Sequence, residues 1–211
     1  MKSTAKLSIV IPLYYNEKNI PVTYAKLKEE VLPHLPDYEL ILVDDGSKDN
    51  SYSEALKLRE QDDKVKVIKL SRNFGQHVAI YAGLEHITGN CAVVISADLQ
   101  DPPELILQMF AKYQEGYKVV LAIREARDES WSQKLFSKTY YKLRKKYAIK
   151  DMPLGEFDCF LADKQVIEVL TKIEEKNTSL FAQVLWLGFK RAEVHYTRQA
   201  REIGTSRWTF S

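Results

Sequence analysis

The sequence predicts an α/β fold with a doubly wound, mostly parallel sheet and helices on both faces. Short apolar runs rich in Val, Ile and Leu recur along residues 7–123, and segments with the apolar spacing of helices separate them. Polar turn residues follow these runs, as is usual where parallel strands end at one edge of a sheet. With 211 residues and 45% hydrophobic composition, the chain has room for one sizeable core.

The first predicted unit runs from residue 7 to residue 43. The runs LSIVIP (7–12) and ELILV (39–43) are rich in β-branched residues and read as buried parallel strands. Between them, residues 17–35 place Ile, Val and Leu among Lys and Glu, which indicates an amphipathic helix. Strand, helix and strand together predict a βαβ unit.

The same alternation continues to residue 123. After the polar turn DDGSKDNS we expect a helix near residues 55–58, followed by strands and helices in turn. The run from Cys91 to Ile95 has no polar alternation, which is typical of a strand buried on both faces. The expected strands are 65–70, 91–95 and 118–123, and the expected helices are 76–86 and 103–114.

Residues 130–148 form the clearest pattern of the second half. Their aromatic and Leu residues share one face of a helix, and Lys and Arg occupy the rest. Such a helix can lie in a layer of anionic lipid headgroups, or pack on the sheet with solvated lysines. Both interpretations stay open from the pattern alone.

Composition excludes few functions. The 31 basic and 29 acidic residues give a net charge of +2, too small to indicate nucleic-acid binding. Cys91 and Cys159 show neither metal spacing nor a disulfide framework, so packing roles in a reducing, cytoplasmic compartment are expected. The short apolar run near the N-terminus ends at Pro12, so we expect neither a signal peptide nor a membrane span there.

The segment after the strand at 91–95 predicts a metal site. Asp98 follows this strand, where ligands of open α/β sheets bind. In an extended segment Gln100 would point to the same side, giving two oxygen ligands suited to Mg²⁺ or Mn²⁺. The alternatives are that Asp98 caps a turn and that Asp101 caps the helix that begins after Pro102-Pro103.

Four segments with polar residues lie at the expected carboxyl ends of strands: IPLYYNE (11–17), VDDGSKDNS (43–51), SRNFGQHVA (71–79) and SADLQDPPE (96–104). In order and spacing they resemble family 2 glycosyltransferases. SRNFGQ, ADLQDPPE and REIGTSRW are similar to the polyprenyl-phosphate glycosyltransferases, which include dolichol-phosphate mannose synthase. The resemblance implies a GT-A type nucleotide-sugar-binding fold and a single catalytic domain over 1–211, with a nucleotide-binding half of about 1–124 and an acceptor-side half of about 125–211.

The resemblance assigns the nucleotide-binding residues. Pro12, Tyr14 and Glu17 would line the base and ribose pocket, with Asp45 at the base and Asp44 orienting the turn. A carboxylate accepts hydrogen bonds from ribose hydroxyls or uracil N–H, and an aromatic ring can flank a base. DDGS is also good turn chemistry, so a turn followed by a helix cap remains the alternative for both acids.

The resemblance also assigns the metal and phosphate ligands. Asp98 and Gln100 match the metal positions, whose usual motif is Asp-Ala-Asp, and here Ser96 replaces the first Asp. Two alternatives stay open: weaker metal affinity, or contact of Ser96, with Ala97, with the nucleotide. Arg124 matches a phosphate-binding position, and Arg127 follows it. Arg201 and Arg207 match a loop that closes over the phosphates, with Gly204 allowing the turn; solvated surface arginines are the alternative.

Asp158 aligns with an acid near the acceptor that has been considered as a base. A phosphate acceptor with a second pKa near ~6 is already ionised at neutral pH and needs no strong base. His77 and His195 have no partner in the sequence, and we expect them to be packing or surface residues.

The resulting hypothesis is an inverting, metal-dependent glycosyltransferase. It would transfer a sugar from a UDP-sugar, UDP-glucose first and GDP-sugars second, to polyprenyl phosphate at the cytoplasmic face of a membrane. Longer family members continue into membrane helices just beyond REIGTSRW, so a chain truncated before such helices is expected. The alternatives are a soluble family 2 enzyme with a hydroxyl acceptor and a non-catalytic nucleotide-sugar-binding module. A homo-oligomer stays open.

Overall fold

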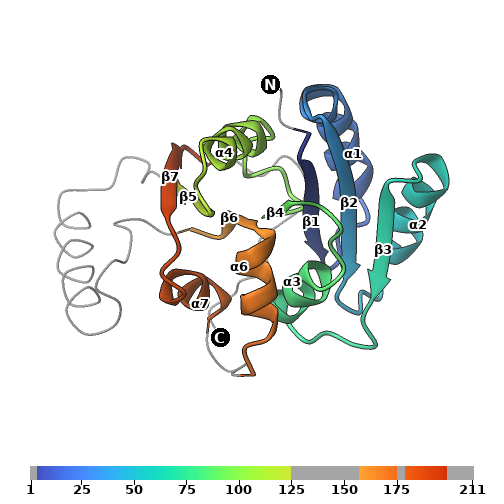
Figure 1. Ribbon diagram of the computed structural model, residues 1–211. Coiled ribbons are helices and arrows are strands. Elements are labelled where there is room, and N and C mark those ends of the chain that lie inside the picture. Colours follow the sequence, from blue (N-terminus) through green and yellow to red (C-terminus); the bar gives the residue numbers. More distant parts are fainter. Residues whose placement is uncertain (1–3, 125–156, 175–178, 199–211) are drawn as a thin grey trace, which may run out of the picture.

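A computed structural model describes residues 4–124, 157–174 and 179–198, and the sheet of these residues is mixed and seven-stranded (Figure 1). Its strand order is β3-β2-β1-β4-β6-β5-β7, and neighbouring strands are parallel except where β6 pairs with β4 and β5. The strands are β1 (Lys6–Leu13), β2 (Asp37–Asp44), β3 (Val65–Lys69), β4 (Cys91–Val94), β5 (Val119–Arg124), β6 (Cys159–Asp163) and β7 (Arg191–Tyr196).

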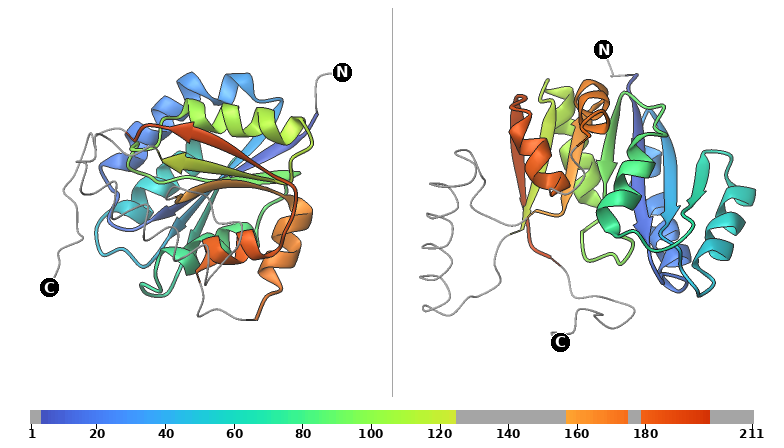
Figure 2. Two further views of the ribbon diagram at one scale, coloured as in Figure 1. Left: turned by 90° about the vertical axis from the view of Figure 1, so that its left-hand side faces the viewer. Right: turned by 90° about the horizontal axis from the view of Figure 1, so that it is seen from below.

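Helices cover both faces of the sheet, which confirms the predicted fold class. The left view of Figure 2 shows α1 and α4 on one side of the sheet and α3, α6 and α7 on the other. The helices are α1 (Asn19–Glu30), the short 3-10 helix η1 (Leu32–His34), α2 (Ser51–Gln61), α3 (Gln76–Leu84), α4 (Glu104–Gln114), α6 (Lys164–Thr171) and α7 (Leu180–Trp186).

The two faces of the sheet carry separate apolar cores. Side chains from β1 alternate between them: Ile9 and Ile11 belong to the core under α1, α2 and α4, whereas Val10 belongs to the core under α3, α6 and α7. Cys91 and Cys159 are buried in the first core, as packing roles required. Burial on both faces explains why these strands read as continuous apolar runs.

The first half agrees with the sequence-based expectations, and the second half adds elements that they missed. The helix expected at 17–35 is shorter, because η1 follows it. β6 and β7 were not expected, and antiparallel β6 lies between β4 and β5. Strands from both sides of residue 124 therefore share one sheet. The helix expected at 130–148 lies outside the described residues.

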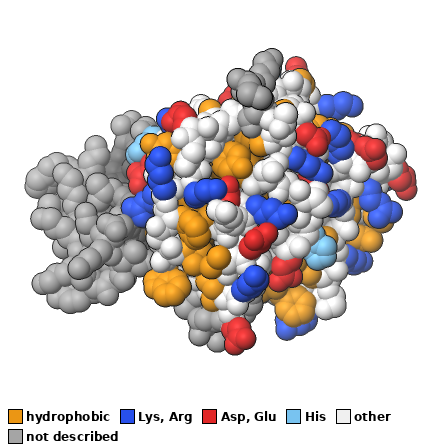
Figure 3. Space-filling view, in the orientation of Figure 1, with side chains coloured by type: hydrophobic (Ala, Val, Ile, Leu, Met, Phe, Trp, Pro, Cys, Tyr) orange, Lys and Arg blue, Asp and Glu red, His pale blue; other side chains and the backbone are white. Residues whose placement is uncertain are grey.

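Charged side chains of both signs are mixed over the face shown in Figure 3. On the face in Figure 3, Lys and Arg lie next to Asp and Glu, with apolar patches between them. This pattern agrees with the small net charge of +2. A field of a single sign does not develop over this face.

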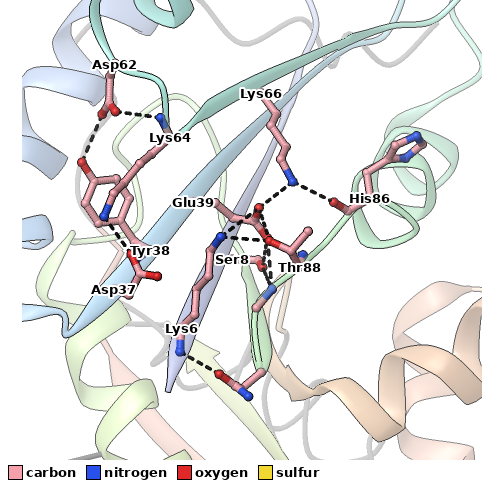
Figure 4. A network of polar contacts seen from close by, with 12 residues as sticks. Lys6, Ser8, Asp37, Tyr38, Glu39, Asp62, Lys64, Lys66, His86 and Thr88 are labelled. Atoms are coloured by element: carbon pink, nitrogen blue, oxygen red, sulfur yellow. Dashed lines mark hydrogen bonds and ion pairs between the residues drawn. The ribbon is translucent and has the colours of Figure 1, made fainter. Parts of the chain in front are cut away.

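A buried carboxylate joins the amino-terminal parts of the parallel strands. Glu39 of β2 is 1% exposed and accepts hydrogen bonds from Ser8 Oγ (2.5 Å), Thr88 N (2.5 Å) and Gly89 N (3.1 Å), while Lys66 Nζ lies 2.7 Å away (Figure 4). Burial alone would raise the pKa of Glu39. The hydrogen bonds from Lys66, Ser8 and Thr88 outweigh burial and lower the pKa from 4.5 to about 2.

We expect Glu39→Gln to lower the free energy of unfolding by roughly 3 kcal/mol at neutral pH, because a pKa lowered on folding stabilises the charged native state. This contribution is present above the pKa of the unfolded chain and is lost as the pH falls from 4.5 toward about 2. Urea unfolding of both proteins at pH 7 and pH 3 measures it. Asp37→Asn is the control, since its pair with Lys64 is exposed and worth under about 1 kcal/mol. Equal losses for the two variants would contradict the role of Glu39.

Candidate functional site

The candidate site lies at the carboxyl edge of the sheet. The register aligns Leu13 of β1 with Asp44 of β2, so the loops that follow these strands start side by side. β4 is parallel to β1 and also ends here. β6 runs the opposite way, so Asp158 enters the sheet at this edge, and the pairing of Arg124 with Tyr196 brings the ends of β5 and β7 to it.

The loop after β4 presents alternate side chains to the site. Ser96, Asp98 and Gln100 are partly exposed, whereas Ala97 and Leu99 are buried. The loop is a turn and not the extended segment expected, and Leu99 has a φ of 56°. The extended geometry on which the same-side placement of Asp98 and Gln100 was predicted is therefore wrong, and a left-handed residue lies between them. Such a conformation is strained for Leu and is a feature of functional sites.

Asp98 also organises its own turn. Its Oδ1 accepts a hydrogen bond from Ser96 Oγ at 2.8 Å and from the Gln100 backbone N–H at 3.3 Å. The turn interpretation and the ligand interpretation of Asp98 are thus compatible. Ser96 at this position contributes a neutral hydroxyl to the loop instead of a charge.

The expectation that Asp101 caps the following helix is wrong. α4 has Pro103 at its N-cap position and no side-chain cap. The Asp101 carboxylate accepts hydrogen bonds from Tyr196 Oη at 2.7 Å and from Ser96 Oγ at 2.9 Å, and Asp101 is 8% exposed. Proline at the start of the helix has no backbone N–H, so fewer N–H groups there need an acceptor. The Asp101 carboxylate is therefore available for other partners.

Asp158 and two arginines form the other side of the site. Arg198 Nη2 lies 3.7 Å from Asp158 Oδ2, and the Asp158 side chain is 40% exposed. Burial and the charge of Asp101 raise the pKa of the Asp158 carboxyl, against the opposite effects of Arg198 and Arg124. Arg124 ends β5, as expected from the sequence.

The sequence analysis missed Arg198. Its Nε is buried and has no hydrogen-bond partner among the described residues. The residue follows Tyr196 by two positions, so the end of β7 carries both. Recognition of 191–196 as a strand ending at this edge would have revealed them, but the run RAEVHY is too polar to stand out.

Asp45 has a firm structural partner. Its two carboxylate oxygens accept hydrogen bonds from the backbone N–H groups of Phe74 (2.7 Å) and Gly75 (2.9 Å), and it is 3% exposed. Gly46 next to it has a φ of 66°, and a Cβ there would clash with the backbone of Arg72. Asp45 therefore holds the segment 71–75 against the end of β2.

Asp44 is fully buried at the same strand end. Its Oδ1 accepts a 3.3 Å hydrogen bond from Ser47 N, as the turn interpretation requires. Its Oδ2 is buried without a hydrogen-bond partner among the described residues. A buried oxygen without a hydrogen bond lowers the stability of the fold, so other contacts must hold the segment around Asp44.

The loop after β1 is tied to the loop after β2. Glu17 Oε2 accepts a hydrogen bond from Asn50 N at 3.1 Å, and Tyr15, with a φ of 55°, donates its N–H to Ser47 Oγ at 3.0 Å. Tyr14 is 43% exposed, and Pro12 is partly buried within β1. The two loops thus hold an exposed aromatic ring at the site edge.

Known proteins with similar sequences decide the family. The profile described as Glycosyl transferase family 2 matches residues 8–182. The chain belongs to glycosyl transferase family 2. It is 41% identical over 209 residues to uncharacterized glycosyltransferase YkcC of Bacillus subtilis and 35% identical over 208 residues to uncharacterized glycosyltransferase sll0501 of Synechocystis. These alignments cover 99% and 98% of this chain but 65% of each relative, so this family 2 chain spans 65% of their length.

Solved structures support the same fold. Mannosyltransferase PcManGT from Pyrobaculum calidifontis, in complex with GDP-Man and Mn²⁺, aligns with a TM-score of 0.64 at 13% identity over 92% of this chain and 56% of its own. Glucosyl-3-phosphoglycerate synthase from Mycobacterium tuberculosis, in complex with Mn²⁺, UDP and phosphoglyceric acid, gives 0.63 at 17% identity over 95% and 72%. The GT-A fold implied by the motifs is thereby confirmed for this family 2 glycosyltransferase chain.

The described residues of this family 2 chain fit a metal with few protein ligands. They contain no group of three or more His, Cys, Asp or Glu side chains placed to hold an ion. Asp98 and Gln100 are partly exposed in the loop after β4, whereas Asp101 is 8% exposed. Mg²⁺ commonly takes one or two carboxylates and completes its shell with phosphate and water.

Other expectations are partly covered by the described residues. The His77 ring packs edge-on against Phe181, and His195 lies 3.8 Å from Glu193, which agrees with packing or surface roles. Arg127, Arg201, Gly204 and Arg207 lie outside the described residues. Within residues 4–124, 157–174 and 179–198, no helix is long and apolar enough to cross a membrane.

We expect Asp45→Ala to release the segment 71–75, because two backbone N–H groups lose a charged acceptor. The free energy of unfolding should fall by about 2–3 kcal/mol, and hydrogen exchange at the amides of Phe74 and Gly75 should accelerate. Gly46→Ala should displace the same segment through its clash with Arg72. Asp63→Ala, at an exposed position, is the control. Unchanged exchange at Phe74 and Gly75 in both variants would show that these contacts do not hold the segment.

Proposed function

We propose that this chain is the donor-binding and catalytic part of an inverting, metal-dependent glycosyltransferase that transfers a sugar from a nucleotide sugar to polyprenyl phosphate. One observation carries the proposal: the loop after β4, with Asp98 and Gln100, follows a strand that ends at the same edge of the sheet as Arg124, Asp158 and Arg198. Family membership supports sugar transfer as the reaction class. The motifs SRNFGQ, ADLQDPPE and REIGTSRW support the lipid-phosphate acceptor.

The donor would bind across the ends of β1, β2 and β4. Tyr14 offers an exposed ring for a base, and Glu17 offers a carboxylate near the ribose. Asp45, buried and bonded to the N–H groups of Phe74 and Gly75, would shape the base pocket by holding the segment 71–75. Pro12 and Asp44 would shape the pocket floor, with Ser96 and Ala97 toward the phosphates. Complexes of structural neighbours with UDP or GDP-Man support a nucleotide-sugar donor, and the motifs favour a UDP-sugar.

Asp98 and Gln100 would hold Mg²⁺ or Mn²⁺. When bound, such an ion supplies Lewis-acid stabilisation of the negative charge on the diphosphate leaving group. Arg124 and Arg198 would add positive charge near Asp158. A guanidinium group can donate two parallel hydrogen bonds to two oxygens of one phosphate. Arg201 and Arg207 would complete this phosphate site.

Transfer would be a single displacement. An oxygen of the acceptor phosphate forms a bond to C1 of the sugar, and the bond from C1 to the diphosphate breaks, with its electron pair leaving on the diphosphate. Attack from the opposite side inverts the anomeric carbon. Because a phosphate monoester has a second pKa near ~6, it attacks without first losing a proton to the protein.

One observation favours a second candidate, a hydroxyl acceptor on a glycan. The raised pKa of the Asp158 carboxyl and its partial exposure suit a residue that accepts a proton during the reaction. A hydroxyl must lose its proton as it attacks, so Asp158 would then be the general base. The two acceptors thus place different demands on Asp158.

The expected location follows from the acceptor. A polyprenyl phosphate exposes its phosphate at a membrane surface, so the chain would work at the cytoplasmic face of that membrane. The residues 130–148, basic and amphipathic in sequence, would lie near the headgroups. Binding to vesicles with and without anionic lipid, compared by sedimentation, would test this placement.

We expect the protein, with Mn²⁺, a panel of UDP- and GDP-sugars and a short polyprenyl phosphate, to form a sugar-phosphate lipid that mass spectrometry detects. Asp98→Asn should lower kcat/KM by about 10³-fold, because stabilisation of the leaving group is lost. Asp63→Asn, at an exposed position, is the matched control. Donor binding without product on any acceptor would favour a non-catalytic binding module.

We expect Asp158→Asn to retain transfer to polyprenyl phosphate within about 30-fold, because the acceptor is already ionised. For a hydroxyl acceptor, the same substitution should lower kcat by about 10³-fold, with no restoration by raising the pH to 8. Measuring kcat for each acceptor from pH 5.5 to 8 separates the two candidates. A loss above 10³-fold with the phosphate acceptor would contradict the proposed mechanism.

A further inference from the structure

Asp101 is a buried acid that does not cap the following helix, and its hydrogen bonds within the described part of the chain come from hydroxyl groups. It is 8% exposed, and its hydrogen bonds come from two hydroxyls, Tyr196 Oη at 2.7 Å and Ser96 Oγ at 2.9 Å. Burying a carboxylate is unfavourable unless its contacts stabilise it. Tyr196 is itself 7% exposed, so the bond between the two residues is shielded from water.

These bonds form a continuous chain across the site. Tyr196 at the end of β7 donates to Asp101, Ser96 bridges Asp101 and Asp98, and Asp98 in turn accepts from the Gln100 backbone. We propose that Asp101 is a positioning residue, and that its hydrogen bond with Tyr196 fixes the loop 96–101 so that Asp98 and Gln100 face the donor's metal ion. The inference rests on the proposed function, since it concerns the residues assigned there to the ion.

The loop requires such support because its backbone is strained. Leu99, with a φ of 56°, lies between Asp98 and Gln100. A non-glycine residue stays in this region only where its surroundings impose it. Asp101 lies two residues after Leu99, and its hydrogen bonds with Ser96 at the start of the loop and with Tyr196 of β7 supply that restraint.

Ser96 suits this chain better than an acid would. A serine hydroxyl carries one proton, which can be shared between two neighbouring carboxylates. With Asp at position 96, three carboxylates would meet where Ser96 Oγ now lies 2.8 Å from Asp98 and 2.9 Å from Asp101. Like charges so close repel strongly, so the bridge depends on the neutral residue.

The end of β7 holds both sides of the site. Tyr196 is paired in the sheet with Arg124 and bonds to Asp101, while Arg198, two residues later, lies beside Asp158. Contacts from one strand, β7, and the residues just after it therefore reach both the loop 96–101 and Asp158. Loss of the Tyr196 hydroxyl should loosen the loop without disturbing the apolar packing of the ring.

The test compares Tyr196→Phe with Tyr24→Phe. Tyr24 is 8% exposed and donates to Asp62 at 2.9 Å, so the control removes the hydroxyl of a similarly buried tyrosine from an aspartate outside this chain of hydrogen bonds. Calorimetry would measure UDP affinity with excess Mn²⁺ and with EDTA, and the ratio of the two affinities reports the metal-dependent part of binding. Thermal unfolding of both variants would report the structural effect.

We expect Tyr196→Phe to lower this ratio by about tenfold, the loss of one hydrogen bond to a charged acceptor, and Tyr24→Phe to leave it within twofold. Asp101→Asn should stay within about threefold, because its amide can accept from Tyr196 and donate to Ser96, whereas Asp101→Ala should lose about tenfold. If the charge of Asp101 acted only by stabilising the fold, Asp101→Asn and Asp101→Ala would lower the affinity ratio alike.

An unchanged ratio in Tyr196→Phe, with a stability loss equal to that of Tyr24→Phe, would overturn the positioning role and leave the proposed function intact. Equal losses for Asp101→Asn and Asp101→Ala would also overturn it. Absence of any Mn²⁺ effect on UDP binding by the unmodified protein would overturn both the metal-dependent function and this inference. The two failures are therefore distinguishable in one set of titrations.

Discussion

The buried carboxylate of Glu39 is the constraint on which the arrangement of the sheet depends. It accepts from Ser8 of β1 and Thr88 of the turn before β4, and it pairs with Lys66 of β3. A slip of one residue in any of these strands would move an acceptor away from its donor and turn apolar side chains to the wrong face. The alignment of the carboxyl ends, where the site forms, therefore follows from contacts at the opposite end of the strands.

The contacts of Glu39 hold the amino-terminal edge of the sheet, and unfavourable backbone and side-chain environments are concentrated at the opposite, carboxyl edge. Tyr15 and Leu99 have φ values of 55° and 56°, and Asp44 Oδ2 is buried with no hydrogen-bond partner in the part of the chain described. Each of these features destabilises the fold on its own. Their concentration in the loops after β1, β2 and β4 is expected where loops are shaped for a ligand and where the remaining strands are held by other contacts.

The sequence was informative where strands are buried on both faces and less so elsewhere. Apolar runs, continuous in β1, β2, β4 and β5 and interrupted by Lys66 in β3, predicted these strands, and the turns after them predicted the site edge. β6 is only a short apolar run, which periodicity does not distinguish from a helix. β7 lies at the sheet edge with exposed Glu193 and His195, so its pattern is too polar to recognise. The bond from Tyr196 to Asp101 joins residues 95 positions apart, and local turn chemistry favoured a helix cap instead.

The replacement of an acid by Ser96 changes how the metal loop is organised. In a loop with two neighbouring acids, repulsion keeps the carboxylates apart until a cation arrives. Here a shared hydroxyl proton holds Asp98 and Asp101 together in the protein alone. If Asp98 and Gln100 bind the proposed ion, less negative charge would be offered to it, but less reorganisation would be needed on binding, because Tyr196 and Asp101 would already hold the loop. A neutral residue in the motif is therefore compatible with metal-dependent catalysis, provided that the hydrogen-bond chain behind it is intact.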